Sequence, residues 1–128
     1  MLAESRFFKG DFVKYILLIY SAEDVWPPDE LEAARDESVR LCHELNDQRQ
    51  YLGASPLHPA ATATCVTVRD GTRTVSDGPF AETKEQLAGY FLIDVANLDE
   101  AIEVAARIPG TTRGTTEIRP IVELPGLP

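Results

Sequence analysis

The stretch VKYILLIY, residues 13–20, decides the fold of this chain, because apolar side chains occupy both of its alternating sets of positions. Successive side chains of a β-strand point to opposite faces of the sheet. One face therefore receives Tyr15, Leu17 and Ile19, and the other receives Ile16, Leu18 and Tyr20. A strand that is apolar on both faces is typical of the interior of a sheet that is covered on both sides.

Two helices are predicted from apolar residues at helical spacing. The first is expected over residues 29–50, after a Trp-Pro-Pro break, with Asp29 as its N-cap and Glu32 in capping-box spacing. The second is expected over residues 97–108 and begins with the same spacing at Asn97. Both helices have one apolar side, which indicates that each packs against the sheet.

Four further strands are predicted, over residues 62–69, 72–76, 88–95 and 115–124. The first two form a hairpin, because the dipeptide between them, Asp70-Gly71, is a strong signal for a two-residue turn. In that register Val66 lies opposite Val75, and Val68 lies opposite Arg73. We expect residues 52–61 to be a loop or a short extended piece, and residues 82–87 to form a short helical turn.

The predicted order is one strand, one helix, two strands, one strand, one helix and one strand. Two helices can cover only one face of an antiparallel sheet of this size. Since residues 13–20 are apolar on both faces, we expect a second copy of the chain to cover the other face. The sequence therefore predicts a homodimer.

The length of 128 residues indicates one domain, which we place at residues 13–124. Residues 1–12 read as an irregular N-terminal leader and residues 125–128 as a C-terminal tail. The formal net charge of −9 argues against binding to nucleic acid or to an anionic membrane. The longest apolar run is too short to span a bilayer, so we expect a cytoplasmic protein.

The two cysteines, Cys42 and Cys65, are far apart in sequence, and we expect both to be reduced and half-buried. With them, His43 and His58 are the only other soft ligand residues, and their spacing matches no metal motif. We therefore predict no metal and no cofactor.

The bend Asp77-Gly78-Pro79-Phe80 has the most specific backbone chemistry in the chain. Pro79 fixes its own φ angle and moves Gly78 away from helical conformation. If the Asp77 carboxylate is partly buried beside Phe80, its charged form is disfavoured and it is a candidate acid or base. Alternatively, the carboxylate accepts backbone N–H groups and stabilises the turn.

Several other residues are candidates for the same site. Glu82 and Lys84 follow the bend, and Lys84 would orient an anionic ligand as a point charge. His58 lies in a proline-rich loop, where an imidazole can act as a base. Tyr90 could place its hydroxyl in a cleft, although aromatic residues of strands usually belong to the core.

Several stretches of the chain together resemble the DGPF subgroup of the YCII-related (YciI-like) family, namely residues 14–20, 62–71, 77–85, 89–94 and 117–121. The resemblance covers about residues 13–123. It implies a ferredoxin-like α+β fold, βαββαβ with an added hairpin strand, that pairs into a dimeric α/β barrel. It also implies a cleft between sheet and helices, and a regulatory link to an extracytoplasmic-function sigma factor.

Other YciI-like proteins use a His–Asp pair for cofactor-free acid–base chemistry, but residues 21–26 of this chain contain no histidine to complete it. The first hypothesis is therefore a small-molecule-binding, regulatory homodimer, whose ligand-binding residues are Asp77, Gly78, Pro79, Phe80, Glu82, Lys84 and Tyr90. The alternative is a cofactor-free acid–base enzyme acting on a small polar substrate, with Asp77 as base and Lys84 or His58 as helper. A third possibility is a structural dimer without a ligand.

Overall fold

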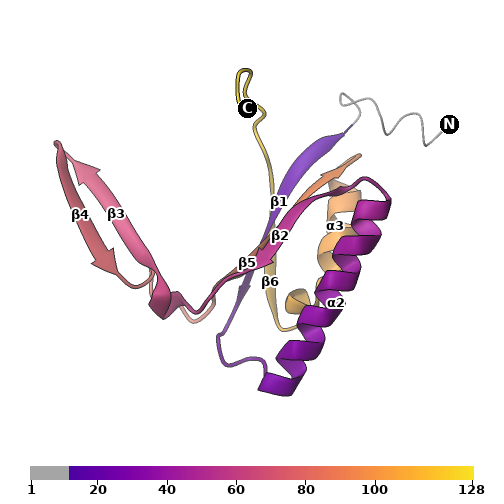
Figure 1. Cartoon of the computed structure of the whole chain (residues 1–128), viewed down its shortest axis with the longest axis horizontal. Coiled ribbons are helices and arrows are strands. Elements are labelled where there is room, and N and C mark those ends of the chain that lie inside the picture. Colours follow the sequence, from indigo (N-terminus) through magenta and orange to yellow (C-terminus); the bar gives the residue numbers. More distant parts are fainter. Residues whose placement is uncertain (1–11) are drawn as a thin grey trace.

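The computed structural model describes residues 12–128 and has an α+β architecture with two antiparallel sheets. The larger sheet has the strand order β2-β5-β1-β6. Its strands are β1 (Val13–Ser21), β2 (Tyr51–Pro56), β5 (Gln86–Val95) and β6 (Gly114–Pro120). Two α-helices, α2 (Pro28–Asp47) and α3 (Leu98–Arg107), lie on the same face of this sheet (Figure 1).

The order of strands and helices is compatible with a ferredoxin-like fold. A hairpin of β3 (Thr64–Arg69) and β4 (Thr72–Asp77) is inserted between the second and third strands of that arrangement. Short 3₁₀ helices, η2 (Ala60–Thr62) and η3 (Pro109–Thr112), precede β3 and β6. The predicted α+β class is thus confirmed.

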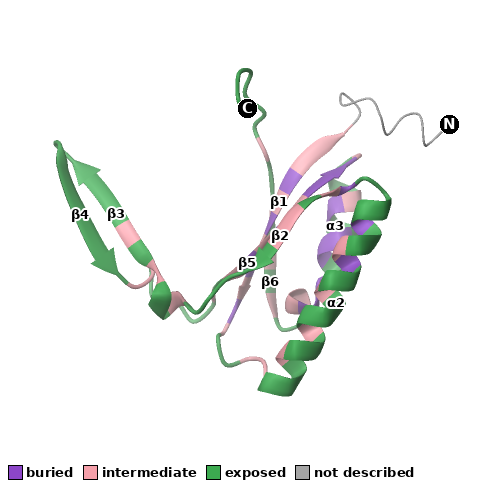
Figure 2. Ribbon diagram, in the orientation of Figure 1, coloured by how far each residue is buried: buried purple, intermediate pink, exposed green. Residues whose placement is uncertain are grey.

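Strand β1 lies inside the sheet, between β5 and β6, as its sequence predicts. Its residues Tyr15, Leu17 and Ile19 are buried beneath the helices. Leu17 pairs with Phe91 on one side and with Ile118 on the other, and its side chain is fully buried. Figure 2 shows the buried residues gathered between the sheet and the helices.

The β1–β5 ladder contains an irregularity near the end of β1. Ile19 pairs with Gly89 and Tyr20 with Leu87, so Ala88 is the extra residue of a bulge in β5. A bulge bends its strand and increases the local twist. It therefore turns the first residues of β5 away from the regular ladder at the edge where the candidate site lies.

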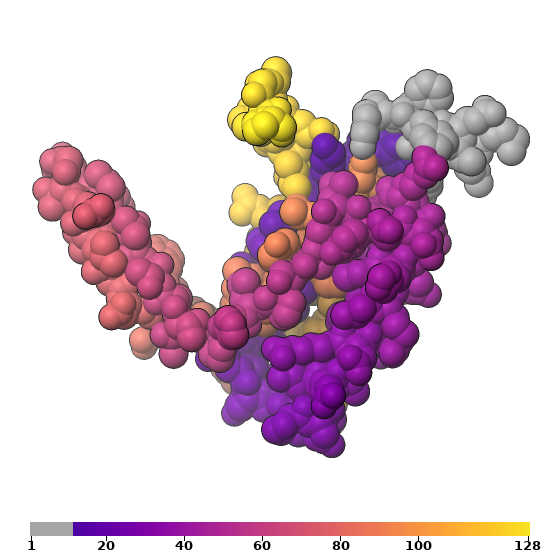
Figure 3. All heavy atoms as spheres, viewed as in Figure 1, coloured from indigo at the N-terminus to yellow at the C-terminus, as the bar shows by residue number. Residues whose placement is uncertain are grey.

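The β3–β4 hairpin has the predicted register, with Val66 opposite Val75 and Val68 opposite Arg73. Its turn residues Asp70 and Gly71 have φ angles of 51° and 75°, as a primed turn requires. The hairpin stands away from the body of the molecule as an arm, and almost all of it is exposed (Figures 2 and 3). Its strands pair with no other strand of residues 12–128.

Two local predictions are wrong. Helix α2 begins at Pro28 with Pro27 as its N-cap, and Asp29 is a first-turn residue rather than the cap. Proline suits the first helical position because its φ angle is already helical and it has no N–H to satisfy there. The expected helical turn over residues 82–87 is irregular before β5 begins. Of the two alternatives for residues 52–61, the short extended piece is observed in the first part, where residues 51–56 form the edge strand β2.

The second predicted cap is confirmed. The Glu100 backbone N–H donates to Asn97 Oδ1 at 3.0 Å, and the Glu100 carboxylate accepts the Ala96 N–H at 2.9 Å. These bonds fix the start of α3 directly after β5. The predicted leader, residues 1–12, lies outside the described residues except for Phe12.

Gly114 offers a test of how tightly β6 packs against β1. A Cβ atom at this position would lie 2.1 Å from the Tyr20 carbonyl oxygen and 2.9 Å from Ser21 Cβ. We expect Gly114→Ala to lower the free energy of unfolding by about 2 kcal/mol, because the backbone must shift to make room. The matched control is Gly53→Ala, whose Cβ meets nothing within 4 Å. Urea unfolding of both variants measures this. Equal free energies of unfolding for Gly114→Ala and Gly53→Ala would contradict the close packing of β6 against β1.

Candidate functional site

A cleft of about 760 Å³ lies between α2 and the sheet. Its apolar lining comes from the strands, from α2 and from the segment after α3, and includes Ile19, Leu31, Ala54, Phe91 and Ile108. Its polar lining includes Ser21, Ser38, Cys42, Asn46 and Tyr51. The volume and the few polar groups on an apolar surface are typical of a small-molecule site.

The cleft exists because α2 carries small side chains where it faces the sheet. Leu41 and Leu45 are buried and fill the space near the C-terminal end of the helix. In the preceding turns the inward residues include Ala34 and Ser38, whose side chains are small, and Cys42 continues this row beside Tyr51. The Ser38 hydroxyl donates to the Ala34 carbonyl oxygen at 2.9 Å, so its polar atom is satisfied within the helix. The helix therefore leaves an open space over the sheet.

Cys42 and Tyr51 form a polar pair in the cleft wall. The Tyr51 hydroxyl and the Cys42 thiol lie close enough for each to affect the ionisation of the other. Burial raises the pKa of the Cys42 thiol, and the nearby Tyr51 hydroxyl partly offsets this rise. Burial likewise raises the pKa of the Tyr51 hydroxyl, with the nearby Cys42 adding to the rise. Both groups are therefore neutral hydrogen-bonding groups at physiological pH.

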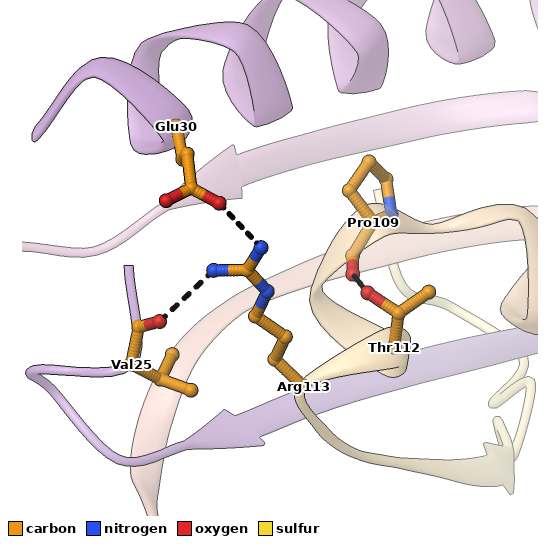
Figure 4. Close-up of polar contacts among 5 residues, drawn as sticks. All are labelled: Val25, Glu30, Pro109, Thr112 and Arg113. Atoms are coloured by element: carbon orange, nitrogen blue, oxygen red, sulfur yellow. Dashed lines mark hydrogen bonds and ion pairs between the residues drawn. The ribbon is translucent and has the colours of Figure 1, made fainter. Parts of the chain in front are cut away.

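Trp26 lies at one end of the cleft and is held there by Arg113. The guanidinium carbon of Arg113 is 4.1 Å from the centroid of the Trp26 ring, within the range of a cation–π contact. The same guanidinium donates to the Val25 carbonyl oxygen at 3.2 Å and to Glu30 Oε1 at 2.6 Å (Figure 4). Arg113 follows η3, where the Thr112 hydroxyl donates to the Pro109 carbonyl oxygen at 2.7 Å (Figure 4). The β1–α2 connection is thereby fixed against the start of β6.

A second, shallower hollow lies at the base of the hairpin. It is lined by five residues of the predicted site, Asp77, Gly78, Pro79, Glu82 and Lys84, together with others that include Glu23 and Asp24. The structure therefore brings most of the predicted ligand-binding residues together. Ala22, Glu23 and Gln86 line both this hollow and the cleft, so the two are neighbours.

The remaining predicted site residues lie elsewhere. Phe80 is 94% exposed and Asp77 is exposed, so the predicted burial of Asp77 beside Phe80 is wrong. The alternative, an Asp77 carboxylate bonded to backbone N–H groups of the turn, is also not observed among the described residues. Tyr90 lies on the face of the sheet opposite the helices, whereas His58 lines the cleft.

The cleft residues of α2 were not singled out as a site by the sequence. His43 reads as an ordinary helix residue, yet it lines the cleft with His58. The sequence does carry one indication of the cleft. On its inward side α2 has the small residues Ala34, Ser38 and Cys42 at positions where large apolar residues would fill the space. Cys42 and Cys65 are both free and half-buried, as predicted. Within residues 12–128, no group of three or more His, Cys, Asp or Glu gathers in a geometry that could hold a metal ion.

Comparison with known proteins places the chain in a family. The model of the YCII-related domain matches residues 13–125. This chain belongs to the YCII-related family. An uncharacterized protein of Rhizobium meliloti (strain 1021) is 39% identical to it, over 84% of this chain and 90% of the relative. The finer resemblance of this YCII-related chain to the DGPF subgroup stays a prediction.

None of the helices in the described part of this YCII-related chain has the length and apolar character needed to cross a membrane. The family match begins at the first residue of β1 and extends past β6. It therefore includes both the cleft and the hairpin.

The raised pKa of Cys42 predicts slow alkylation, because the thiolate is the reacting form. In a Cys65→Ser variant, we expect iodoacetamide at pH 7.5 to modify Cys42 roughly threefold or more slowly than it modifies glutathione. The alkylation rate of Cys42 should keep rising at pH values above those at which the alkylation rate of glutathione becomes constant. Mass spectrometry measures the rate, and the same variant in urea is the control, since unfolding removes the burial. A folded-state rate equal to that in urea would contradict the assigned environment.

Proposed function

We propose that this YCII-related protein binds a small, largely apolar molecule in the cleft between α2 and the sheet. The observation that carries the proposal is the cleft itself, about 760 Å³ in volume, with an apolar floor and few polar groups. The apolar side chains around a space of this size lack the packing contacts that they would have in a filled core. A bound apolar molecule would restore those contacts.

Trp26 provides a direct readout of binding, because it is the only tryptophan of the chain and lines the cleft. We expect the neutral dye N-phenyl-1-naphthylamine to bind and to quench Trp26 fluorescence by energy transfer. Ala34→Phe should weaken binding by about tenfold or more, about 1.4 kcal/mol, since the added ring fills the cleft. The matched control is Ala33→Phe, which places the same ring on an exposed position of α2 outside the lining.

Two outcomes of this titration are informative. Equal weakening by Ala33→Phe and Ala34→Phe would assign the effect to helix stability rather than to the cleft. Dye binding unchanged by Ala34→Phe would place the dye elsewhere and contradict the proposal.

We also propose that the protein is a homodimer in which two sheets meet face to face as a dimeric α/β barrel. The face of the sheet opposite the helices carries half-buried apolar side chains from its two central strands, namely Ile16, Leu18, Tyr20, Tyr90 and Leu92. A surface of this kind on a monomer marks an interface. In a two-fold dimer the same patch serves on both copies.

The hairpin arm supports the same assembly. Val66, Val68 and Val75 share one of its faces and are each more than half exposed. An isolated two-stranded hairpin is marginally stable in water. A second copy seated against the open sheet face would lie beside the arm and cover these valines.

Sedimentation equilibrium tests the dimer. We expect the protein to be dimeric at micromolar concentration, and the double substitution Val66→Thr and Val75→Thr to weaken the dimer by about tenfold, because threonine keeps the strand propensity but not the apolar contact. Val39→Thr, at an exposed valine of α2, is the control. A wild-type protein that is monomeric at these concentrations would refute the assembly.

The link to a sigma factor and the acid–base role of Asp77, with Lys84 or His58 as helper, stay predictions from the sequence. The structure adds one relevant feature. His58 lines the cleft, whereas Asp77 and Lys84 line the hollow beside the hairpin.

A further inference from the structure

We propose that the ligand of the cleft is an amphipathic anion, with an apolar body on the cleft floor and a carboxylate or similar oxyanion at the rim. This inference rests on the proposed function and adds the chemical class of the ligand. It follows from the distribution of charge around the cleft.

The lining of the cleft carries little negative charge, although the protein is acidic. The chain has 21 acidic residues and a net charge of −9, but among residues 12–128 only one acidic residue, Glu23, lines the cleft. The Glu23 carboxylate already accepts the Ala60 N–H at 2.6 Å. Within the described part of the chain, Arg35 is the only fully charged base of the lining, and both histidines of the chain, His43 and His58, are also in the lining.

Arg35 has no protein partner among residues 12–128. Two arginines from other elements do pair with acidic residues of α2, since Arg107 pairs with Glu44 and Arg113 pairs with Glu30. Arg35 makes no ion pair or hydrogen bond, although acidic residues flank it on α2. Its guanidinium offers paired donors in a geometry that matches a carboxylate.

The other donors lie on the same rim. Arg35, Val39 and His43 are spaced four residues apart, so they form one row along the edge of α2, about 12 Å long. His58, from the loop after β2, lies in the opposite wall. Neither imidazole has a hydrogen-bond partner within the described residues. A neutral imidazole carries one N–H donor, so both add to the donors available for an oxyanion.

The floor of the cleft defines the rest of the ligand. Ile19, Ala54, Phe91 and Ile108 offer no charge, and Ser38 is bonded within its own helix. A small polar anion would gain little from this floor, while a neutral apolar molecule would leave the donors of the rim unused. A polyanion such as a nucleotide is disfavoured by the negative field of the whole protein. A single oxyanion on a hydrocarbon or aryl body satisfies both parts of the cleft.

Competition between matched probes tests this class. Decanoate and 1-decanol have the same chain length and differ in their head groups. In displacement of N-phenyl-1-naphthylamine from the wild-type protein, we expect decanoate to act at a concentration at least fivefold lower than 1-decanol. Arg35→Glu should abolish or reverse this preference, because it places a negative charge at the rim.

The control for this substitution is Arg40→Glu, which makes the same change in net charge on an exposed position of α2 outside the lining. It should leave the preference for decanoate intact. Arg35→Gln removes the positive charge without introducing a negative one. In this variant decanoate and 1-decanol should displace the dye at similar concentrations. Dye affinity should change less than twofold in Arg40→Glu, and urea unfolding checks that the two Arg35 variants are still folded.

The outcomes separate the two proposals. If the dye binds and Ala34→Phe expels it, but decanoate is no better than 1-decanol, the cleft is a binding site and the anionic class is wrong. If Arg40→Glu lowers the preference as much as Arg35→Glu, net charge rather than Arg35 is responsible and the inference is overturned. If the dye does not bind to the wild-type protein, the proposed function and the ligand class both fail.

Discussion

The structure depends on a single strand that is apolar on both faces. Leu17 of β1 is fully buried and lies in register between Phe91 of β5 and Ile118 of β6. Both helices pack over this row, so the order of the sheet and the position of the helices are set together. The same strand provides Ile19 to the cleft floor, and its other face carries Ile16 and Leu18 away from the helices. The fold and the open face are therefore two consequences of one sequence pattern, and the same strand contributes to the floor of the cleft.

Helix α2 contacts other elements at both of its ends, and between these ends the cleft separates it from the sheet. Near its C-terminal end, Leu41 and Leu45 are buried, and Glu44 pairs with Arg107 of α3. At its N-terminal end, Glu30 pairs with Arg113. Exposed ion pairs contribute little to stability on their own, but they restrict where the helix can lie. Because the ends are held, the helix is not free to tilt inward and close the space over its small residues. The cleft is thus a stable feature of the packing.

Much of the fold follows from local patterns in the sequence. The alternation in β1 predicts a central strand, Asp70-Gly71 predicts the hairpin with its register, and Asn97 predicts the start of α3. The start of α2 was misassigned to Asp29 because the side chain of Asp29 fits a cap, whereas Pro28 at the first helical position needs none. For the region of strand β2 the sequence leaves a loop and a short extended piece open, because Pro56 and Pro59 exclude a helix but nothing local selects a strand. Its pairing with β5 is a long-range interaction that outweighs its weak strand propensity.

The candidate site was less predictable, for a physical reason. The bend after β4 carries a strong local signal, and its residues do gather at one hollow. A cleft between sheet and helices is implied by the family resemblance, but its residues carry only a weak local signal, because the cleft arises where small side chains leave the space between α2 and the sheet unfilled. Ala34, Ser38 and Cys42 are unremarkable in a helix, and their consequence appears only when the helix is placed over Phe91 and Ala54. A cleft that forms because side chains are small becomes apparent only when the helix and the sheet are placed together.

The bend has a structural role that connects the hairpin arm with the cleft. Gly78 has a φ angle of 96°, which few other residues adopt, and its N–H donates to the Ala63 carbonyl oxygen at 2.8 Å. The Cys65 thiol donates to the Gly78 carbonyl oxygen at 3.3 Å, so both sides of the arm are joined at its base. Glu23 bonds to Ala60 just before the arm begins and lines the cleft as well as the hollow. The direction of the arm and the edge of the cleft are therefore set by one connected group of contacts.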